Sequence, residues 1–346
     1  LRLWNARPVD PIKLDQFNQG DHIGAQVDTT QAESITRVLY PSDATPAGQE
    51  LRLRQEYFFT SASLQDLLRR HLNQYGSLLN LAEKAAIQLN DTHPALAIPE
   101  LLRLLLDVHD LDWTLAWGIS CQLFGYTNHT LLPEALETWP VAFFERLLPR
   151  HLEIIYRING EFLLEVERRW PHDDAAKSAL SLIAEGYGRR VRMAHLAVVG
   201  SHKVNGVAKL HSELVRKTVF AGFAALYPER FTNVTNGITV RRWLKQSNPG
   251  LSQLLTERLG AAWENDLEEL ERLVGSAEDP EFRARFRDIK LANKRRLVAA
   301  SDARTGLDVS LPALFDVQVK RIHEYKRQLL NLLYVVTRYQ RIRANP

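Results

Sequence analysis

The amino-acid sequence predicts a soluble α/β protein of about two domains. Its 346 residues are 45% hydrophobic and 25% charged, a composition typical of a globular protein with a large buried core. Short apolar runs at residues 191–200 and 314–319 predict buried strands. Residues 94–107 and 151–170 carry apolar side chains every three or four positions, which predicts amphipathic helices. Strands mixed with helices in this way indicate an α/β fold.

Charge and cysteine usage exclude several function classes. The net charge of +3 is small for this length, which argues against nucleic-acid binding. No apolar run reaches the roughly 18 residues that a membrane span needs. The one cysteine, Cys121, rules out a disulfide within the chain and favours a buried thiol in a reducing, cytoplasmic compartment.

The first third of the chain mixes both element types. Residues 1–4 (LRLW) predict a strand already under way, and hence a piece of a longer polypeptide. Residues 21–38 predict a polar helix, residues 41–48 a loop and residues 51–59 an alternating strand. Asp112 is placed to cap a helix that Gly125 ends.

Helices dominate the remainder. A helix is expected at residues 206–223, and a turn-rich passage at residues 232–243 is interpreted as a domain junction. Residues 251–274 and 279–301 predict two helical stretches. A last helix at residues 323–343 follows the strand at 314–319, and a strand without a neighbour implies that the second domain is incomplete.

Two polar clusters suit the binding of a sugar. They are Asn90, Asp91, Thr92 and His93, and Tyr126, Thr127, Asn128, His129 and Thr130. Short polar side chains at element ends often serve only as turn or cap residues. Dense amide, imidazole and hydroxyl groups are also what a sugar requires, because each sugar hydroxyl both donates and accepts.

A basic cluster suits a phosphate. Lys320, Arg321, Lys326 and Arg327 lie where a strand is expected to lead into a helix, whose unpaired N–H groups attract anions. A solvated helix start is the alternative. The eleven histidines include no pair at metal-ligand spacing, and His195, His202 and His211 are expected in the core. No nucleophile elbow, dinucleotide fingerprint or P-loop is present.

Five motifs resemble the α-1,4-glucan phosphorylases, the family of glycogen, starch and maltodextrin phosphorylase, and its bacterial branch in particular. They are QLNDTHP (88–94), YTNHTLLPEALE (126–137), VNGVAKLHSELV (204–215), TNGIT (235–239) and FDVQVKRIHEYKRQLLN (315–331). The resemblance implies a GT-B-like glycosyltransferase with two Rossmann-like domains, truncated here at both ends. Residues 1–235 would be part of the N-terminal domain, with a dimer-contact helix at 21–38 and a gate loop at 41–48. Residues 236–346 would begin the C-terminal, cofactor-binding domain.

The same resemblance implies a reaction and a cofactor. Such enzymes release glucose 1-phosphate from the non-reducing end of an α-1,4-glucan with retention, using inorganic phosphate. They are cytoplasmic homodimers that hold pyridoxal 5'-phosphate as a Schiff base and use its phosphate group for proton transfer, which fits the absence of an acid–base pair. The Schiff-base lysine is expected beyond Pro346, so the isolated chain is expected to be inactive.

Roles for single residues also follow from the resemblance. Arg321 and Lys326 would bind the substrate phosphate, and His129 would present its main-chain carbonyl to the transition state. Asp43, Asp91, His93, Asn128, Asn236 and Tyr325 would contact the sugar, with His129 and Asn236 at its 6-hydroxyl. Lys320 and Trp243 would contact the cofactor.

Two departures from the family pattern stand out. Ala44 replaces an asparagine that is a sugar ligand in the gate loop, and Val240 replaces a common proline. Two readings therefore compete with the middle of an active phosphorylase. They are a non-catalytic glucan-binding or assembly protein of the same fold and, disfavoured by charge, a nucleic-acid binder.

Overall fold

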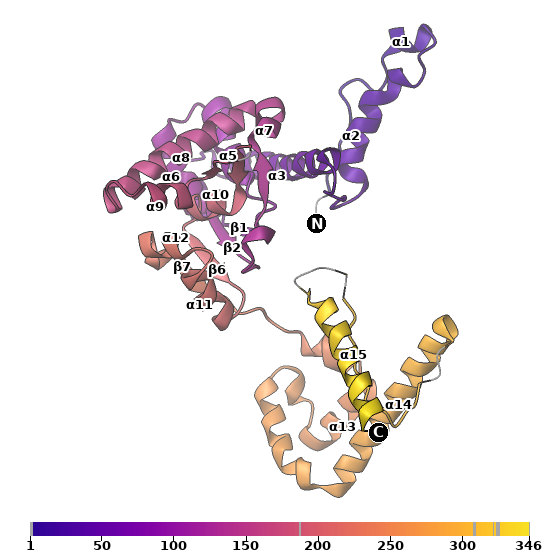
Figure 1. The fold of residues 1–346 in the computed structure, drawn as a ribbon. Helices are drawn as coiled ribbons and strands as arrows, with labels where there is room; N and C mark the ends of the chain where they lie inside the picture. Colours follow the sequence, from indigo (N-terminus) through magenta and orange to yellow (C-terminus); the bar gives the residue numbers. More distant parts are fainter. Residues whose placement is uncertain (1–2, 187, 307–308, 321, 323–325, 346) are drawn as a thin grey trace. The chain divides into compact units, whose positions relative to one another are not determined.

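A computed structural model describes residues 3–186, 188–306, 309–320, 322 and 326–345 of the chain (Figure 1). The chain forms two compact units, Leu1–Asn236 and Gly237–Pro346. All strands found in the described residues belong to the first unit. That unit therefore supplies any site built on a sheet edge.

The first unit is organised around a four-stranded parallel sheet. Its strands lie in the order β1 (Ile87–Asn90), β2 (Phe124–Thr127), β6 (Lys203–Gly206) and β7 (Phe231–Asn233). Ile87 pairs with Phe124, Gly125 with Lys203 and Val204 with Phe231. Because all neighbouring strands are parallel, their carboxyl ends meet at one edge. A small antiparallel sheet accompanies it, in the order β3 (Thr138–Pro140), β5 (Arg190–Arg192), β4 (Ile183–Ala184).

The first unit contains twelve α-helices in its described residues, most of them packed around the parallel sheet. They are α1 (Leu14–Asn18), α2 (Val27–Arg37), α3 (Pro46–Tyr75), α4 (Leu81–Lys84), α5 (Ala97–Arg103), α6 (Trp113–Leu123), α7 (Val141–Leu147), α8 (Pro149–Arg169), α9 (Asp174–Leu180), α10 (Met193–Val199), α11 (Lys209–Lys217) and α12 (Ala221–Leu226). A π-helical turn, Leu104–Val108, extends α5, and α5 packs on both α3 and α8. One continuous apolar core joins the helices from α3 onward to the sheet, whereas α1 and α2 bury no side chain, and α2 packs on α3.

The strand expected at residues 51–59 is wrong, because the segment lies inside the 30-residue helix α3. The side chains that α3 buries include Leu53, Glu56, Thr60 and Leu64, which recur every three or four residues and mark one helical face. The loop expected at 41–48 ends early. Thr45 caps the helix by accepting a hydrogen bond from the Gly48 N–H at 3.2 Å.

The strand expected at residues 191–200 is also wrong beyond its first residues. Only Arg190–Arg192 is a strand, and the apolar remainder is helix α10. Met193, Leu196 and Val198 are all buried, so α10 is enclosed on every side and shows no amphipathic pattern that distinguishes it from a strand.

Other expectations fare unevenly. Asp112 does cap α6, accepting from the N–H groups of Thr114 and Leu115 at 2.9 and 3.1 Å. The helix expected at 206–223 is two helices, α11 and α12, broken at Thr218. Leu3 and the following residue have no regular structure, and residues 1–2 lie outside the described chain, so the opening strand is not found.

The histidine expectations need one correction. His202 is exposed rather than part of the core, because it lies just before β6, where only its backbone N–H bonds to Phe124. His195 is largely enclosed, its Nδ1 lies 3.0 Å from the Ser181 carbonyl oxygen, and burial lowers its pKa to about 4. His211 is half-buried.

Cys121 behaves as a largely enclosed thiol. It lies on α6 and lines a cavity of about 110 Å³ together with Phe162 and Tyr227. Burial raises its pKa to about 12, and the nearby Arg230 only partly opposes this. The thiol is therefore protonated at neutral pH.

The second unit is helical in its described residues. It contains a π-helix, Arg241–Gln246, then α13 (Pro249–Leu259), two 3₁₀ segments (Ala262–Glu264 and Leu267–Glu278), α14 (Pro280–Thr305) and α15 (Gln328–Ala344). Among its described residues, the buried hydrophobic side chains are Leu254, Leu255, Leu259 and Trp263, of which the last three pack together. No side chain of α15 is buried.

The strand expected at residues 314–319 is wrong. The segment has no regular structure, and Leu314 and Val319 are 94% and 85% exposed. A strand exists only when its backbone pairs with another, and the described part of this unit offers no partner. The last helix begins at Gln328 rather than residue 323, and residues 323–325 lie outside the described chain.

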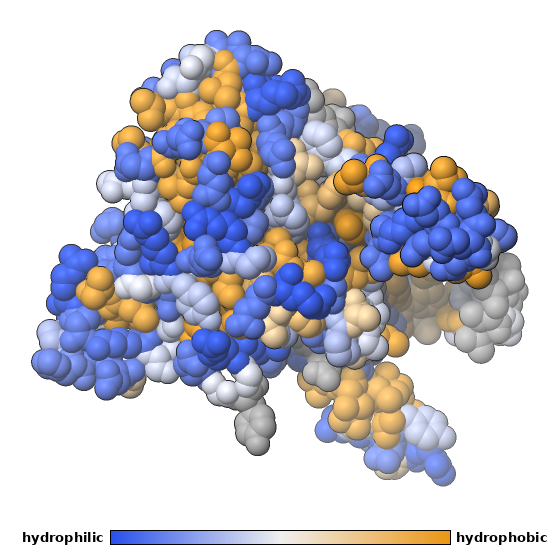
Figure 2. Space-filling view, turned by 90° about the horizontal axis from the view of Figure 1, so that it is seen from above, coloured by the Kyte–Doolittle hydropathy of each residue, from blue (hydrophilic) through white to orange (hydrophobic). Residues whose placement is uncertain are grey.

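Within the described residues no helix is long and apolar enough to cross a membrane. On the face seen in Figure 2, hydrophobic residues are interspersed with hydrophilic ones instead of forming one band.

Candidate functional site

The carboxyl edge of the parallel sheet gathers the polar clusters of the sequence. Asn90 ends β1, Thr127 ends β2 and Gly206 ends β6, and these strands are neighbours. In open α/β sheets, ligands bind at this edge. Of the residues predicted to bind substrate, Asp91 and His93 follow β1, and Asn128 and His129 follow β2. Asn236 follows β7, the fourth strand of the same sheet, and all five belong to the first unit.

A hydrogen bond joins the first two clusters. His129 Nε2 lies 2.5 Å from Asn90 Oδ1, which links the residue after β1 to the loop after β2. The Asp91 N–H donates to the Thr127 carbonyl at 3.0 Å, and Asp91 has φ +71°, in the left-handed region. A non-glycine residue in that region carries a backbone strain that the surrounding contacts must offset. The loop is therefore held in one specific shape.

A second layer of amides supports these loops from the strands. Thr127 Oγ1 donates to Asn205 Oδ1 at 2.9 Å, while Gln88 Nε2 donates to Thr127 Oγ1 and Asn205 Oδ1 at 2.9 and 3.2 Å. These three side chains come from β1, β2 and β6, so the network ties the three strands together where the loops leave the sheet.

Asn128 is wholly buried. Its N–H donates to the Asn205 carbonyl at 2.9 Å and its Nδ2 donates to the Tyr126 hydroxyl at 3.2 Å. Its Oδ1 is buried and has no hydrogen-bond partner among the described residues. A buried acceptor left unpaired is costly, which makes this oxygen available to a donor from a ligand or water.

Hydrogen bonds link the loops that follow the parallel strands β6 and β7. The Asn236 N–H donates to the Val207 carbonyl at 3.0 Å, and the Val207 N–H donates to His211 Nδ1 at 3.1 Å. Ser212 Oγ donates to Asn233 Oδ1 at 2.7 Å, which attaches the start of α11 to β7. Asn236 itself is exposed, and so is His129.

A pocket of about 310 Å³ opens next to this edge. Tyr40, Arg52, Glu56, Asn90 and His93 are among its lining residues. The ring of Tyr40 lies 5.1 Å from that of His93. Asp43, predicted to contact the sugar, is exposed and forms a 2.5 Å ion pair with Arg52. The segment between α2 and α3 thus forms one wall of the pocket.

Two carboxyl groups lie behind this pocket. Burial raises the pKa of Glu56 well above its ordinary 4.5, and the neighbouring Glu137 raises it further. Burial also raises the pKa of Glu137. Trp139 Nε1 donates to Glu56 Oε2 at 3.2 Å. Both shifts favour the protonated form, because two buried carboxyl groups next to each other resist carrying two negative charges.

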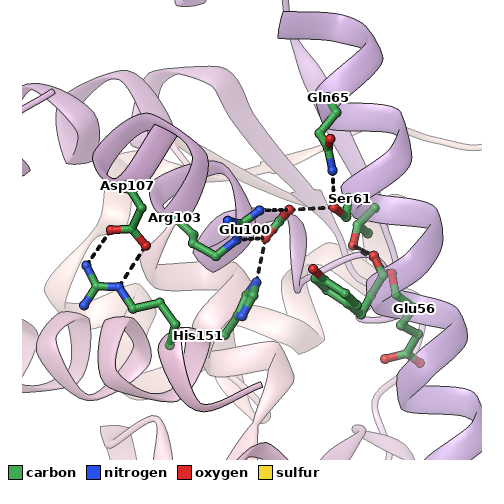
Figure 3. A network of polar contacts seen from close by, with 10 residues as sticks. Glu56, Ser61, Gln65, Glu100, Arg103, Asp107 and His151 are labelled. Atoms are coloured by element: carbon green, nitrogen blue, oxygen red, sulfur yellow. Dashed lines mark hydrogen bonds and ion pairs between the residues drawn. The ribbon is translucent and has the colours of Figure 1, made fainter. Parts of the chain in front are cut away.

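A charged network ties α3, which supplies Arg52 and Glu56 to the pocket lining, to α5 and α8 (Figure 3). Glu100 is fully buried and accepts from Ser61 Oγ at 2.6 Å, from Arg103 Nε and Nη2 at 2.8 and 2.9 Å, and lies 2.6 Å from His151 Nε2. Although burial acts to raise its pKa, the bonds from Arg103, His151 and Ser61 hold it at about 2. The carboxylate thus joins α3, α5 and α8.

The remaining predicted residues belong to the second unit or fall outside the described chain. Trp243 lies on the π-helix and is 62% exposed. The backbone carbonyl of Lys320 accepts from Gln328 Nε2 at 3.0 Å, and Lys326 precedes α15. Arg321 and Tyr325 lie outside the described residues. No described group of histidine, cysteine and carboxylate side chains could hold a metal ion.

Sequence reasoning did not identify several residues of this edge. Gln88, Asn205 and His211 shape the loops, and Tyr40 and Arg52 form the pocket wall. Gln88 and Asn205 each lie within two residues of a strand end in apolar runs, which is the signal that could have indicated them. Nothing local to Tyr40 or Arg52 distinguishes them from surface residues.

Comparison with known proteins gives one consistent result. The sequence pattern of the carbohydrate phosphorylases matches residues 1–346. The chain is 51% identical over 346 residues to a glycogen phosphorylase of Haemophilus influenzae, covering all of this chain and 42% of that protein. It is 50% identical over 343 residues to one of Chlamydia trachomatis, with 99% and 42% covered. It is 49% identical over 354 residues to the brain form of Mus musculus, with 100% and 42% covered. The chain spans less than half the length of these relatives.

Proposed function

Since the chain belongs to the carbohydrate phosphorylase family, we propose that the protein containing it is an α-1,4-glucan phosphorylase. That protein uses inorganic phosphate to release glucose 1-phosphate from the non-reducing end of glycogen, starch or maltodextrin, with retention. The observation that carries the proposal is the sheet edge where Asn90, Asp91, His93, His129 and Asn236 converge. It offers the paired donors and acceptors that a glucosyl unit requires.

Each residue of this edge has a proposed role. His129 and Asn236 bind the 6-hydroxyl, and the His129 carbonyl faces the positive charge that develops on the sugar. Asp91 and His93 line the glucosyl pocket, supported by the strain and hydrogen bonds that hold the β1 loop. Asn128 directs its unpaired Oδ1 to the same site. Asp43 and the wall around Tyr40 act as the gate, in which Ala44 leaves the sugar one ligand fewer.

The cations of the second unit fit a phosphate site. Lys320, Arg321 and Lys326 lie close together in the sequence ahead of α15, and cations gathered at one site would offset the repulsion between two phosphate groups. This donor set fits pyridoxal 5'-phosphate beside a substrate phosphate, with Trp243 against the cofactor. When bound, the cofactor supplies a phosphate group that exchanges a proton with the substrate phosphate.

Architecture and assembly are part of the proposal. The first unit would be part of the N-terminal domain and the second the start of the C-terminal domain of a GT-B-like fold. Helix α2 begins at the exposed Val27, and Ile23 just before it is exposed too; the helix and this preceding turn would contact a second copy in a cytoplasmic homodimer. Light scattering on the full-length protein at micromolar concentration tests this, and a monomer mass contradicts it.

The activity test uses the full-length protein with maltodextrin and phosphate, with and without added pyridoxal phosphate. Glucose 1-phosphate is the expected product. Arg321→Ala should lower the rate at least about 100-fold, the effect of deleting one preorganised donor. Arg338→Ala, on the exposed face of α15, is the matched control and should change little. Glucan binding without product would favour the non-catalytic alternative.

A further inference from the structure

One imidazole connects the two loops that carry the proposed 6-hydroxyl ligands. His211 lies on the first turn of α11, and its Nδ1 accepts the Val207 N–H at 3.1 Å. The carbonyl of the same Val207 accepts the Asn236 N–H at 3.0 Å. Two consecutive hydrogen bonds, both made by the Val207 backbone, therefore connect the His211 ring to Asn236.

The other ring nitrogen faces the second loop. Because Nδ1 accepts a hydrogen bond, the neutral ring carries its proton on Nε2. Nε2 is buried without a hydrogen-bond partner among the described residues, and the imidazole lies against the backbone of Thr130. Thr130 directly follows His129. A small movement of this loop would let Nε2–H donate to the Thr130 carbonyl.

The surroundings leave the ring little freedom. A Cβ on Gly206 would lie 2.7 Å from His211 Nδ1 and 2.8 Å from the Ser212 Cα, so the strand end and the ring pack closer than any side chain at residue 206 permits. The Ser212–Asn233 bond at 2.7 Å fixes the next residue of α11 to β7. Backbone thus sets the ring on one side, and the ring lies beside the His129 loop on the other.

We propose that His211 is a positioning residue for recognition of the primary hydroxyl of the glucosyl unit. Its two nitrogens set the loops of His129 and Asn236 so that both side chains reach the same hydroxyl. The inference rests on the proposed function. It predicts an effect on which sugar is accepted, whereas a purely structural role would change stability and leave the choice of sugar unaltered.

The experiment measures sugar selectivity in the direction of synthesis. The full-length protein extends maltodextrin with glucose 1-phosphate or with α-D-xylose 1-phosphate, which lacks the hydroxymethyl group, and the ratio of the two kcat/KM values is compared. A site that binds a hydroxyl loses this preference when its ligands are misplaced. His211→Ala should lower the ratio at least about tenfold.

Two further variants separate the contributions of the two ring nitrogens of His211. His211→Asn places an acceptor near the position of Nδ1 and should restore most of the ratio. His211→Gln reaches the position of Nε2 and should restore less. His202→Ala, an exposed histidine that precedes β6, is the matched control and should leave the ratio unchanged. Circular dichroism confirms that each variant is folded.

The outcomes are distinguishable. A folded wild-type protein that does not turn over glucose 1-phosphate contradicts the proposed function. If the wild type is active, the proposed role of His211 is overturned when His211→Ala keeps the wild-type ratio of kcat/KM values. It is also overturned when His211→Gln restores more of that ratio than His211→Asn does, and in both cases the activity itself stays established.

Discussion

Glu100 illustrates how a single buried charge organises helices. It is fully buried, and its carboxylate is satisfied by Ser61, Arg103 and His151 from three helices. Removing one member of such a set leaves the others buried and unpaired. The network holds α3 at Ser61, directly after the α3 residues that line the pocket.

We expect Glu100→Gln to lower the free energy of unfolding by about 3–5 kcal/mol, because Arg103 and His151 lose their charged partner. Urea denaturation monitored by circular dichroism measures this. The matched control is Gln65→Ala, which removes only the bond from Gln65 to Ser61 at the edge of the network and should cost about 1 kcal/mol. Equal costs for both variants would contradict the role assigned to Glu100.

The carboxyl pair of Glu56 and Glu137 should make the stability of the fold fall as the pH rises. Glu100 acts in the opposite direction, because its lowered pKa makes stability fall as the pH drops. Burial raises both pKa values above 4.5, so between pH 4.5 and the raised values the unfolded chain loses protons that the folded chain retains. The wild type should therefore lose stability as the pH rises through this window. Glu137→Gln keeps one donor and one acceptor without needing the proton. Its melting temperature relative to wild type should increase from pH 5 to pH 8, and a constant difference would refute the raised pKa values.

At the scale of elements, periodicity predicted structure only where one face meets solvent. Residues 151–170 became α8 because its apolar side is buried and its polar side is not. Helix α10 was predicted wrongly as a strand, because a helix enclosed on all sides has no polar face to reveal its period. Residues 51–59 carry an incidental alternation, and packing of α3 on α5 decided for a helix. Tertiary contacts determine the structure of both segments, and a short stretch of sequence does not reveal such contacts.

The site was predictable as chemistry but not as geometry. The residues around Asn90 and His129 were identified from their polar types. Their proximity depends on β1 pairing with β2, and on β2 pairing with β6 across the intervening helices. The pocket wall from Tyr40 and Arg52 depends on where α3 lies, which the sequence pattern misassigned.

Glycine 206 gives an element-scale prediction about the junction of β6 and α11. Gly206→Ala forces its new methyl group against His211 and the backbone of Ser212. We expect a loss of at least about 2 kcal/mol of stability, because backbone cannot yield as a flexible side chain does. The control is Gly160→Ala on the surface of α8, where a Cβ meets nothing within 4 Å. It should stabilise the helix by up to about 1 kcal/mol. Thermal melts of both variants decide the comparison.

At the scale of the molecule, the two units differ in how much core they hold. The first has a continuous core from α3 to β7, whereas the buried hydrophobic cluster among the described residues of the second consists of Leu255, Leu259 and Trp263. Helix α15 exposes Leu329, Leu333 and Val336. Unequal cores predict unequal resistance to unfolding.

Limited proteolysis of the 346-residue chain should reveal this difference. The segment after β7 has no regular structure, and Val234 and Ile238 are 59% and 65% exposed. A protease of broad specificity should cut there first, leaving a resistant fragment close to Leu1–Asn236 while the remainder is degraded. Mass spectrometry identifies the fragments. A first cut within α3 or α8 would show that the units have been delimited wrongly.

The enclosed thiol of Cys121 has a practical consequence for labelling. Maleimides react with thiolates, and a thiol with a pKa of about 12 supplies almost none at pH 7. Cys121 should therefore react very slowly with maleimides in the folded chain. Cysteines introduced at exposed positions, Leu164 on α8 and Val274 in the second unit, would be the reactive ones. A dye pair attached at these two positions would report the distance between the two units by energy transfer, without first replacing Cys121.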